Sequence, residues 1–469
     1  MTKPTSLADF RFDPESGSDY IDAAFVAIEI TRLLREGDSK AVAEFLESQE
    51  LADVAAYLEE LETPDAMTAV RLLPLHDQAE VIGYLRPSSQ LTMATQMTRR
   101  ELARLMSAMS HDERADLYKV LDPEVQAAIL PALSQAERED LRRLAAYDEA
   151  TVGSVMTSDY ATLGPEMTAT QAIEALRAQA MEAETVYTAY IVDEARKLIG
   201  VVSLRDLLMA RPRQRVADIM DTEPVWVRAS AEQEEAARLI ARYDLIALPV
   251  LDDADQLVGI VTADDAMDVA EDETTEDIHK SGLVGPFETS VAEATIAVLY
   301  KARIYWLVLL VFGNIFSGAG IAYFEDTIAA HLALMFFLPM LIASGGNAGS
   351  QAATLMVRAL ATGDVEFRDW GYLLLRELAV ALALGLTMAF AVSFLGFWRG
   401  DASLAATVSL SMVLIVVVGS LIGMSLPFAL ARFNLDPATA SAPLVTSIAD
   451  VVGVMIYFSI ATSFLSLPS

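Results

Sequence analysis

From residue 301 onward the chain is a series of long apolar stretches separated by short polar segments. The last two of these stretches are interrupted only by Asp450. Because a bilayer core about 30 Å thick needs roughly 20 apolar residues per helix, we join those two stretches into one span. The pattern predicts five membrane helices, at 302–323, 328–357, 371–397, 403–431 and 437–466.

The N-terminal part has a different pattern. Residues 21–146 show helical periodicity that is broken at short intervals by proline, as at Pro64, Pro87 and Pro123. Short amphipathic helices joined by proline-containing turns predict an α-helical superhelix. Residues 1–20 lack this periodicity, and we expect them to form a disordered tail.

Residues 153–270 contain an internal duplication. Ser154-Val155-Met156 recurs 64 residues later as Asp218-Ile219-Met220, and residues 199–206 recur 59 residues later as 258–265. Each copy has the pattern strand, helix, strand, strand, helix. The duplication resembles a tandem pair of cystathionine-β-synthase (CBS) domains, which implies an α+β fold for this region.

In the CBS family, the Ser/Thr and Asp of a Gly-x-Val/Ile-Ser/Thr-x-x-Asp ending can hold the ribose and phosphates of an adenosine. The matching residues are Ser203 with Asp206, and Thr262 with Asp265. The resemblance therefore implies ATP as a ligand of the pair. A regulatory scaffold that binds no nucleotide is the alternative.

The charge of the chain is divided very unevenly between these regions. The whole chain carries a net charge of −33, yet it is 54% hydrophobic. The last 174 residues hold nine acids and seven bases, whereas the first 295 hold 57 acids and 26 bases. An acidic soluble part is thus followed by a nearly uncharged membrane part, and the acidic part will repel nucleic acid.

Two other features narrow the class of protein and its orientation. The chain has no Cys, which excludes disulfides, Cys-ligated metal sites and thiol catalysis, and its N-terminus has no apolar signal segment. We therefore expect the N-terminal domains to be cytoplasmic. The positive-inside rule agrees and places the C-terminus outside, because Arg399 is the one base on the other side. The bases on the cytoplasmic side are Lys301, Arg303, Arg358, Arg368, Arg376 and Arg432.

Two features inside the membrane part indicate a cation pathway. Asp450 is a carboxylate within an apolar span, where it costs at least about 2.5–3.5 kcal/mol. The second is the run of small and polar residues at 344–351. A helix–helix hydrogen bond for Asp450 and simple small-residue packing for the run are the alternatives. Hard oxygen ligands favour Mg²⁺, Ca²⁺ or Mn²⁺, and one acid per chain favours a symmetric dimer that contacts a hydrated ion.

Acidic residues are dense at the end of the CBS pair and in the segment that leads to the membrane. A run of charges is most simply a solvated face, but crowded carboxylates that repel one another can also be bridged by a divalent cation. We favour cation sensing. The candidate ligands are Asp218, Asp252, Asp253, Asp264, Asp265, Asp268, Glu271, Glu273, Glu276 and Asp277.

The motifs of the membrane part and its connector resemble the MgtE family of magnesium channels and transporters. They are the runs 345–354 (Gly-Gly-Asn-Ala-Gly-Ser-Gln-Ala-Ala-Thr), 436–438 (Asp-Pro-Ala), 443–446 (Pro-Leu-Val-Thr) and 275–280 (Thr-Glu-Asp-Ile-His-Lys). The resemblance covers nearly the whole chain. It implies a tail (1–20), a helical N domain (21–148), a CBS pair (149–271), a connecting plug helix (272–300) and a transmembrane domain (301–469).

The same resemblance implies a function. It implies a homodimer in a bacterial plasma membrane, with a Mg²⁺ pore on the dimer axis that closes when cytosolic Mg²⁺ binds the N domain, CBS pair and plug. Asp450 would be the selectivity carboxylate and also a metal ligand. The other implied pore residues are Gly345, Gly346, Asn347, Ala442 and Thr446.

The sequence also bears on other classes of function. An intramembrane metalloprotease needs His-Glu-x-x-His, which the four His do not form. A nucleotide-metabolising CBS enzyme would need a catalytic domain, and no segment of the sequence remains for one. We therefore expect that the protein is not an enzyme. A transporter of other divalent cations such as Co²⁺ or Mn²⁺, and a Mg²⁺-sensing membrane protein without transport, stay open.

Overall fold

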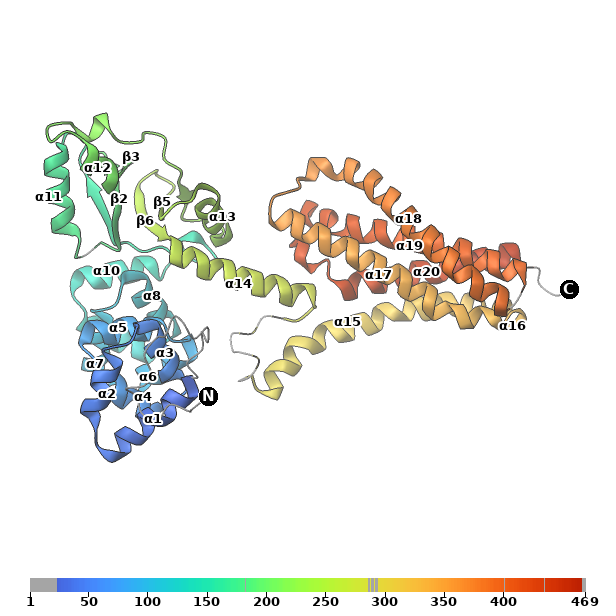
Figure 1. Cartoon of the computed structure of the whole chain (residues 1–469), viewed down its shortest axis with the longest axis horizontal. Coiled ribbons are helices and arrows are strands. Elements are labelled where there is room, and N and C mark those ends of the chain that lie inside the picture. The colour runs from blue at the N-terminus through green and yellow to red at the C-terminus, as the bar shows by residue number, and fades with distance from the viewer. Residues whose placement is uncertain are drawn as a thin grey trace, which may run out of the picture. The chain divides into compact units, whose positions relative to one another are not determined.

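A computed structural model describes residues 23–181, 183–285, 287, 291, 294–399, 401–433 and 435–465 (Figure 1). The chain divides into two compact units between Glu271 and Asp272, and each is described by itself. The tail predicted at 1–20 lies outside the described residues.

The first unit begins with helices whose neighbours alternate. Odd-numbered helices contact odd-numbered ones (α1 with α3, α3 with α5, α5 with α7, α7 with α9), and α2, α4, α6, α8 and α10 form the second row. This is the predicted superhelix. Proline occupies a first-turn position of α4, α6 and α9, where its missing N–H costs nothing. The bounds are α1 Ala23–Glu36, α2 Ser39–Leu46, α3 Leu51–Glu59, α4 Thr63–Val70, α5 Leu75–Gly83, α6 Pro87–Gln96, α7 Arg99–Met106, α8 His111–Val120, α9 Pro123–Ile129 and α10 Gln135–Leu144.

The CBS pair follows and contains two three-stranded sheets, in the orders β1-β2-β3 and β4-β5-β6. In each sheet the first two strands are parallel and the last two antiparallel. The predicted order of elements is confirmed in both copies. The bounds are β1 Tyr160–Leu163, α11 Ala169–Gln179, β2 Thr185–Val192, β3 Leu198–Ser203 and α12 Leu204–Met209, then β4 Val227–Arg228, α13 Gln233–Tyr243, β5 Ala247–Leu251, β6 Leu257–Thr262 and α14 Ala263–Ser281.

The last helices of the two copies differ in length. α12 ends at Met209, three residues before Pro212, whereas α14 runs for 19 residues. Its sequence contains neither Gly nor Pro, so nothing in it stops the helix. The connecting helix therefore starts directly after β6, inside the segment that the sequence assigned to the CBS pair.

Among its described residues, the second unit contains five helices long and apolar enough to cross a membrane, as predicted. They are α15 Ile296–Tyr323, α17 Ala333–Ala361, α18 Trp370–Arg399, α19 Ala402–Arg432 and α20 Ala442–Phe464. Three predicted starts, at 302, 328 and 437, were wrong by five or six residues. The short helix α16 Glu325–Ala330 precedes α17, and the 3₁₀ turn η6 Pro437–Thr439 precedes α20, whose N-cap is Ser441. α15 begins at Ile296, inside the segment 272–300 that the resemblance assigned to the connecting plug helix.

α19 lies between α17 and α18 and contacts both along its length (Figure 1). Glycines let the backbones of α17 and α19 meet. A Cβ atom on Gly349 would lie 2.7 Å from the carbonyl oxygen of Gly419, and one on Gly423 would overlap the carbonyl oxygen of Gly349. Close helix packing, one of the two interpretations of the 344–351 run, is therefore correct for Gly349.

We predict that Gly423→Ala destabilises the membrane domain by about 1–3 kcal/mol, because its methyl group meets backbone rather than a movable side chain. Thermal unfolding of the purified protein in detergent would measure this. Gly318→Ala is the matched control, since its Cβ has no neighbour within 4 Å. Equal stability of the two variants would contradict the packing argument.

Candidate ion pathway and cation-sensing carboxylates

The contact between α17 and α20 brings together three of the predicted pore residues. A Cβ atom on Gly346 would lie 3.0 Å from Cγ2 of Thr446, and the Ser350 hydroxyl donates a hydrogen bond of 3.4 Å to the Ala442 carbonyl oxygen. Because 346 faces 446 and 350 faces 442, the two helices are antiparallel. The two contacts lie one helical turn apart on each helix.

The other two predicted pore residues of α17 lie on different sides of that helix. Asn347 is exposed. Gly345 is buried, and a Cβ atom there would lie 3.2 Å from the carbonyl oxygen of Ile415 in α19. Gly345 thus serves the packing of α17 on α19, while Gly346 faces α20.

Asp450 lies one helical turn beyond Thr446 on the same face of α20, about 12 Å along the axis from the start of the helix. Its side chain is partly exposed in the single chain. In the part of the chain that the structure describes, no base and no hydrogen-bond donor contacts its carboxylate. Within one chain, the described residues therefore do not show the alternative, a helix–helix hydrogen bond of Asp450.

A second set of carboxylates lies where the N domain meets the CBS pair. Asp112, in the first turn of α8, approaches Asp265 in the first turn of α14 closely enough to change its ionisation, and Glu113 follows Asp112 in the same turn. Burial, then the charge of Asp112, raises the pKa of Asp265 to about 8, and the same two causes raise the pKa of Glu113 to about 7. These acids lack enough positive charge around them.

The Asp112 carboxylate is the most deeply buried of this set. Its pKa is raised, mainly by burial, and its Oδ1 atom is buried without a hydrogen-bond partner in the described residues. A buried carboxylate oxygen without a donor fits a cation that is bound in the functioning protein. The donor set is all oxygen, which suits Mg²⁺.

The sequence did not single out Asp112 or Glu113, because acids are common throughout the N domain. It did single out Asp264, Asp265 and Asp268 of α14. The pKa of Tyr84, at the end of α5, is raised first by burial and then by the charges of Glu80 and Glu113. The charges of Asp264 and Asp268 raise it further. These α14 acids therefore face the N domain.

The remaining predicted ligands of the first unit are elsewhere. Asp218 is exposed on the 3₁₀ turn Val216–Asp218, and Asp253 and Glu271 are exposed. The Oδ1 atom of Asp252 accepts hydrogen bonds from the backbone N–H groups of Ala254 and Gln256, which close the β5–β6 turn. No group of three or more acidic or His side chains in the described ranges has the geometry of a preformed metal site.

His111, next to Asp112, links the N domain to the first CBS copy. Its Nδ1 atom lies 2.9 Å from carboxylate oxygens of both Asp140 and Asp159, and 2.6 Å from the Ser158 hydroxyl. Burial lowers the pKa of His111, but the two carboxylates outweigh burial and raise it to about 9. This ion pair connects α8 and α10 to the segment before β1.

In the second unit, two predicted ligands at the end of α14 lie beside Asp436. The Lys280 Nζ atom is 2.6 Å from Oε1 of Glu276 and 2.6 Å from Oδ2 of Asp436. Burial, then the charge of Asp436, raises the pKa of Asp277. Glu273, also in α14, is partly buried and contributes to that shift.

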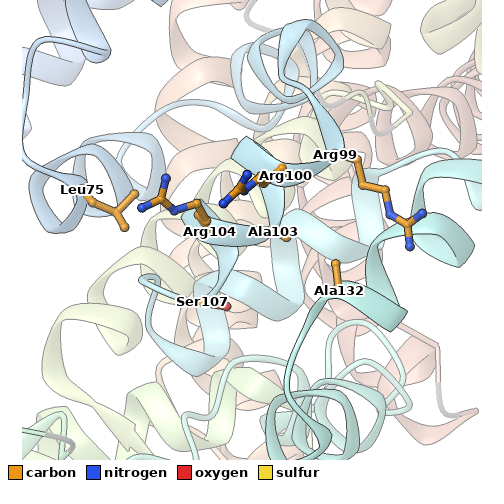
Figure 2. Close-up of a pocket in the computed structure, with 7 residues that line it drawn as sticks. All are labelled: Leu75, Arg99, Arg100, Ala103, Arg104, Ser107 and Ala132. Carbon is orange, nitrogen blue, oxygen red and sulfur yellow. The ribbon is translucent and has the colours of Figure 1, made fainter.

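A hollow of about 500 Å³ in the N domain has the opposite character (Figure 2). Three of the residues that line it are arginines of α7, and Figure 2 shows Arg100 and Arg104 extending toward Leu75 while Arg99 extends the other way. Like charges of this sign repel a cation. This hollow is therefore not a candidate for the metal.

Comparison with known proteins agrees with this architecture. Family models match residues 338–460 (MgtE, divalent cation transporter), 49–150 (MgtE intracellular N domain), and 152–213 and 216–272 (CBS domain). The magnesium transporter MgtE of Thermus thermophilus is 40% identical over 93% of this chain and 98% of its own. The chain belongs to the MgtE family of magnesium transporters. The MgtE protein of Bacillus subtilis is 32% identical over 93% of this chain and 97% of its own.

Solved structures extend the comparison to the soluble part. The cytosolic domain of the Mg²⁺ channel MgtE in complex with ATP is 38% identical, with a TM-score of 0.50, and covers 52% of this chain and 99% of that one. The soluble part of a magnesium transporter is 28% identical, with the same score, over 54% and 99%. An inosine-5′-monophosphate dehydrogenase of Methanocaldococcus jannaschii matches only 24% of this MgtE family member. The family relatives are transporters, not enzymes.

The raised pKa values give the stability of the first unit a predictable pH dependence. Glu113 and Asp265 hold protons up to about pH 7 and 8 in the folded protein, but only to about pH 4 when unfolded. The folded state therefore binds more protons between these values, so stability falls as pH rises. His111 acts in the same direction between pH 6.5 and about 9.

We expect the unfolding temperature in EDTA to fall from pH 5 to pH 8, and millimolar Mg²⁺ to restore most of the loss. Glu113→Gln should reduce the pH dependence, whereas the exposed Glu44→Gln should not change it. A pH dependence that Glu113→Gln leaves intact would contradict the assignment.

Proposed function

We propose that the chain conducts hydrated Mg²⁺ into the cell through a pore on the axis of a homodimer, with Asp450 as the selectivity carboxylate. The observation that carries this proposal is that Asp450 is partly exposed at membrane depth and has no counter-charge in the described chain. A carboxylate facing lipid is costly, so this side chain faces water, a cation or a second copy.

A dimer satisfies this requirement economically. Two copies related by a twofold axis bring two Asp450 residues to the axis, with Thr446, Ala442, Gly346 and Asn347 nearby. Two carboxylates and neutral oxygens attract a divalent cation. Mg²⁺ loses its water reluctantly, so the contact is made through its hydration shell.

The acidic clusters would close this pore when cytosolic Mg²⁺ is plentiful. In the first unit the residues that would hold regulatory ions are Asp112, Glu113, Asp264 and Asp265, supported by the buried Asp112 oxygen without a donor. In the second unit they are Glu276, Asp277 and Asp436. Bound cations would remove the repulsion among these acids and favour the conformation in which they are close together.

The orientation and the domain division follow from the same proposal. The N domain (21–148), the CBS pair (149–271) and the connecting segment (272–300) are cytoplasmic, and the C-terminus is outside. Membrane lipid surrounds residues 301–469, in a bacterial inner membrane. Helix α15 supports this, because among its described residues none is buried by the chain itself.

ATP is proposed as a second cytosolic ligand, at the CBS pair. In each copy the predicted hydroxyl and carboxylate already contact one another, since Ser203 bonds to Asp206 and Thr262 to Asp265. A ribose would replace these partners. The ATP complex of the related cytosolic domain supports this assignment, and Asp265 would then serve both nucleotide and metal.

Replacing the pore carboxylate tests the transport proposal. In liposomes, Asp450→Ala should reduce Mg²⁺ uptake to that of protein-free vesicles, while Asp326→Ala, which removes an exposed acid of α16, should leave it unchanged. A panel of Mg²⁺, Mn²⁺, Co²⁺ and Ca²⁺ measures selectivity, and size-exclusion chromatography checks the dimer. Undiminished uptake by a dimeric Asp450→Ala protein would overturn the proposal.

Neutralising the sensor tests the closing mechanism. The pair Asp112→Asn with Glu113→Gln should raise the internal Mg²⁺ concentration needed for half-closure several-fold, because the cation gains less by bridging uncharged groups. Glu124→Gln on α9 is a control of the same type. If both variants close at the same Mg²⁺ concentration as the unmodified protein, this cluster is not the sensor.

A further inference from the structure

One ammonium group joins the connecting helix to the start of the last membrane helix. The Lys280 side chain is about one-third exposed, and its Nζ atom lies 2.6 Å from carboxylate oxygens of both Glu276 and Asp436. The contact with Glu276 lies within one helical turn. The contact with Asp436 crosses from α14 to the turn before α20, and is the one that fixes two elements together.

Asp436 occupies a position from which movement can reach the proposed pore. Its other carboxylate oxygen, Oδ1, accepts a hydrogen bond of 2.8 Å from the Ala438 N–H and so caps η6. Ser441 then caps α20, which carries Ala442, Thr446 and Asp450. A force on Asp436 therefore acts on the first turn of the helix with the selectivity carboxylate.

Lys280 lies on the same helix, α14, as the proposed sensing residues Asp264 and Asp265. α14 is continuous from Ala263 to Ser281, and the division between the two units falls within it, between Glu271 and Asp272. The sensing acids and the Lys280 contact are two ends of one element.

The charge at this junction is only partly neutralised. Glu276, Asp277 and Asp436 supply three negative charges around one ammonium. Burial lowers the pKa of Lys280, but the hydrogen bonds to Asp436 and Glu276 outweigh burial and raise it, so the group stays charged. The remaining negative charge equals that of one divalent cation.

We propose that Lys280 is a tethered cation that holds the end of α14 on Asp436 before any metal binds, and thereby sets the Mg²⁺ concentration at which the pore closes. This inference rests on the proposed function. Mg²⁺ then strengthens a contact that the chain already makes. Without the ammonium the metal would have to form the whole contact.

Removing the ammonium tests this directly in the full-length protein. Lys280→Met should raise the internal Mg²⁺ concentration for half-closure two- to fivefold in liposome flux, and Lys280→Arg should stay close to the unmodified protein. Lys40→Met is the matched control, since Lys40 also pairs with an acid four residues away, Glu44, but forms no ion pair with another element among the described residues. Unchanged or easier closure in Lys280→Met would overturn the proposal.

Exchanging the two charges separates a tether from a metal ligand. Lys280→Asp and Asp436→Lys should each impair closure alone, and the double variant should recover most of it because the ion pair is restored in reverse. If Asp436 acts only as a Mg²⁺ ligand, the double variant will be no better than Asp436→Lys, and the proposal fails.

A readout that does not depend on transport keeps this proposal distinct from the proposed function. In EDTA, amide hydrogen exchange in residues 276–281 should become several-fold faster in Lys280→Met and remain unchanged in Lys40→Met. Unaltered exchange would refute the tether even if Mg²⁺ flux is normal. A protein without Mg²⁺ flux would refute the proposed function, while exchange would still report on the contact.

Discussion

The structure depends on carboxylates that the chain places close together, or at membrane depth, without enough positive charge to balance them. Asp450 has no base near it in the described residues, and Asp112 buries an oxygen that no donor reaches. Ionised groups in such surroundings are costly unless a counter-charge arrives. Under the proposed function a bound cation supplies this counter-charge, and Lys280 supplies part of it at one place.

The membrane helices hold this arrangement by close backbone contact. Gly345 and Gly349 let α17 meet α19, and α19 in turn packs on α18. With that side of α17 committed to packing, Gly346 and Ser350 face α20, and Asn347 remains exposed. A single run of small residues thus has two purposes, since successive residues of a helix point about 100° apart.

The α14 helix relates the sensing and conducting regions through a local property of the sequence. Nothing between Ala263 and Ser281 breaks a helix, so the acids near its start and Lys280 near its end belong to one continuous helix. Its acids would repel one another on a flexible chain. On a helix, each is directed to a different neighbour, the first to the N domain and the last to Asp436.

The sequence by itself determined the five membrane helices, the superhelix, the two CBS copies and the isolation of Asp450, because periodicity, long apolar runs and an internal repeat are local properties. It also contained the family motifs. Only the tertiary structure decided that Gly345 packs against α19, that Asp252 closes a turn, and that Asp112 lies near Asp265. It likewise paired Lys280 with Asp436. Residues far apart in the chain meet through packing, and a side chain's partners depend on distance in space, which local patterns do not encode.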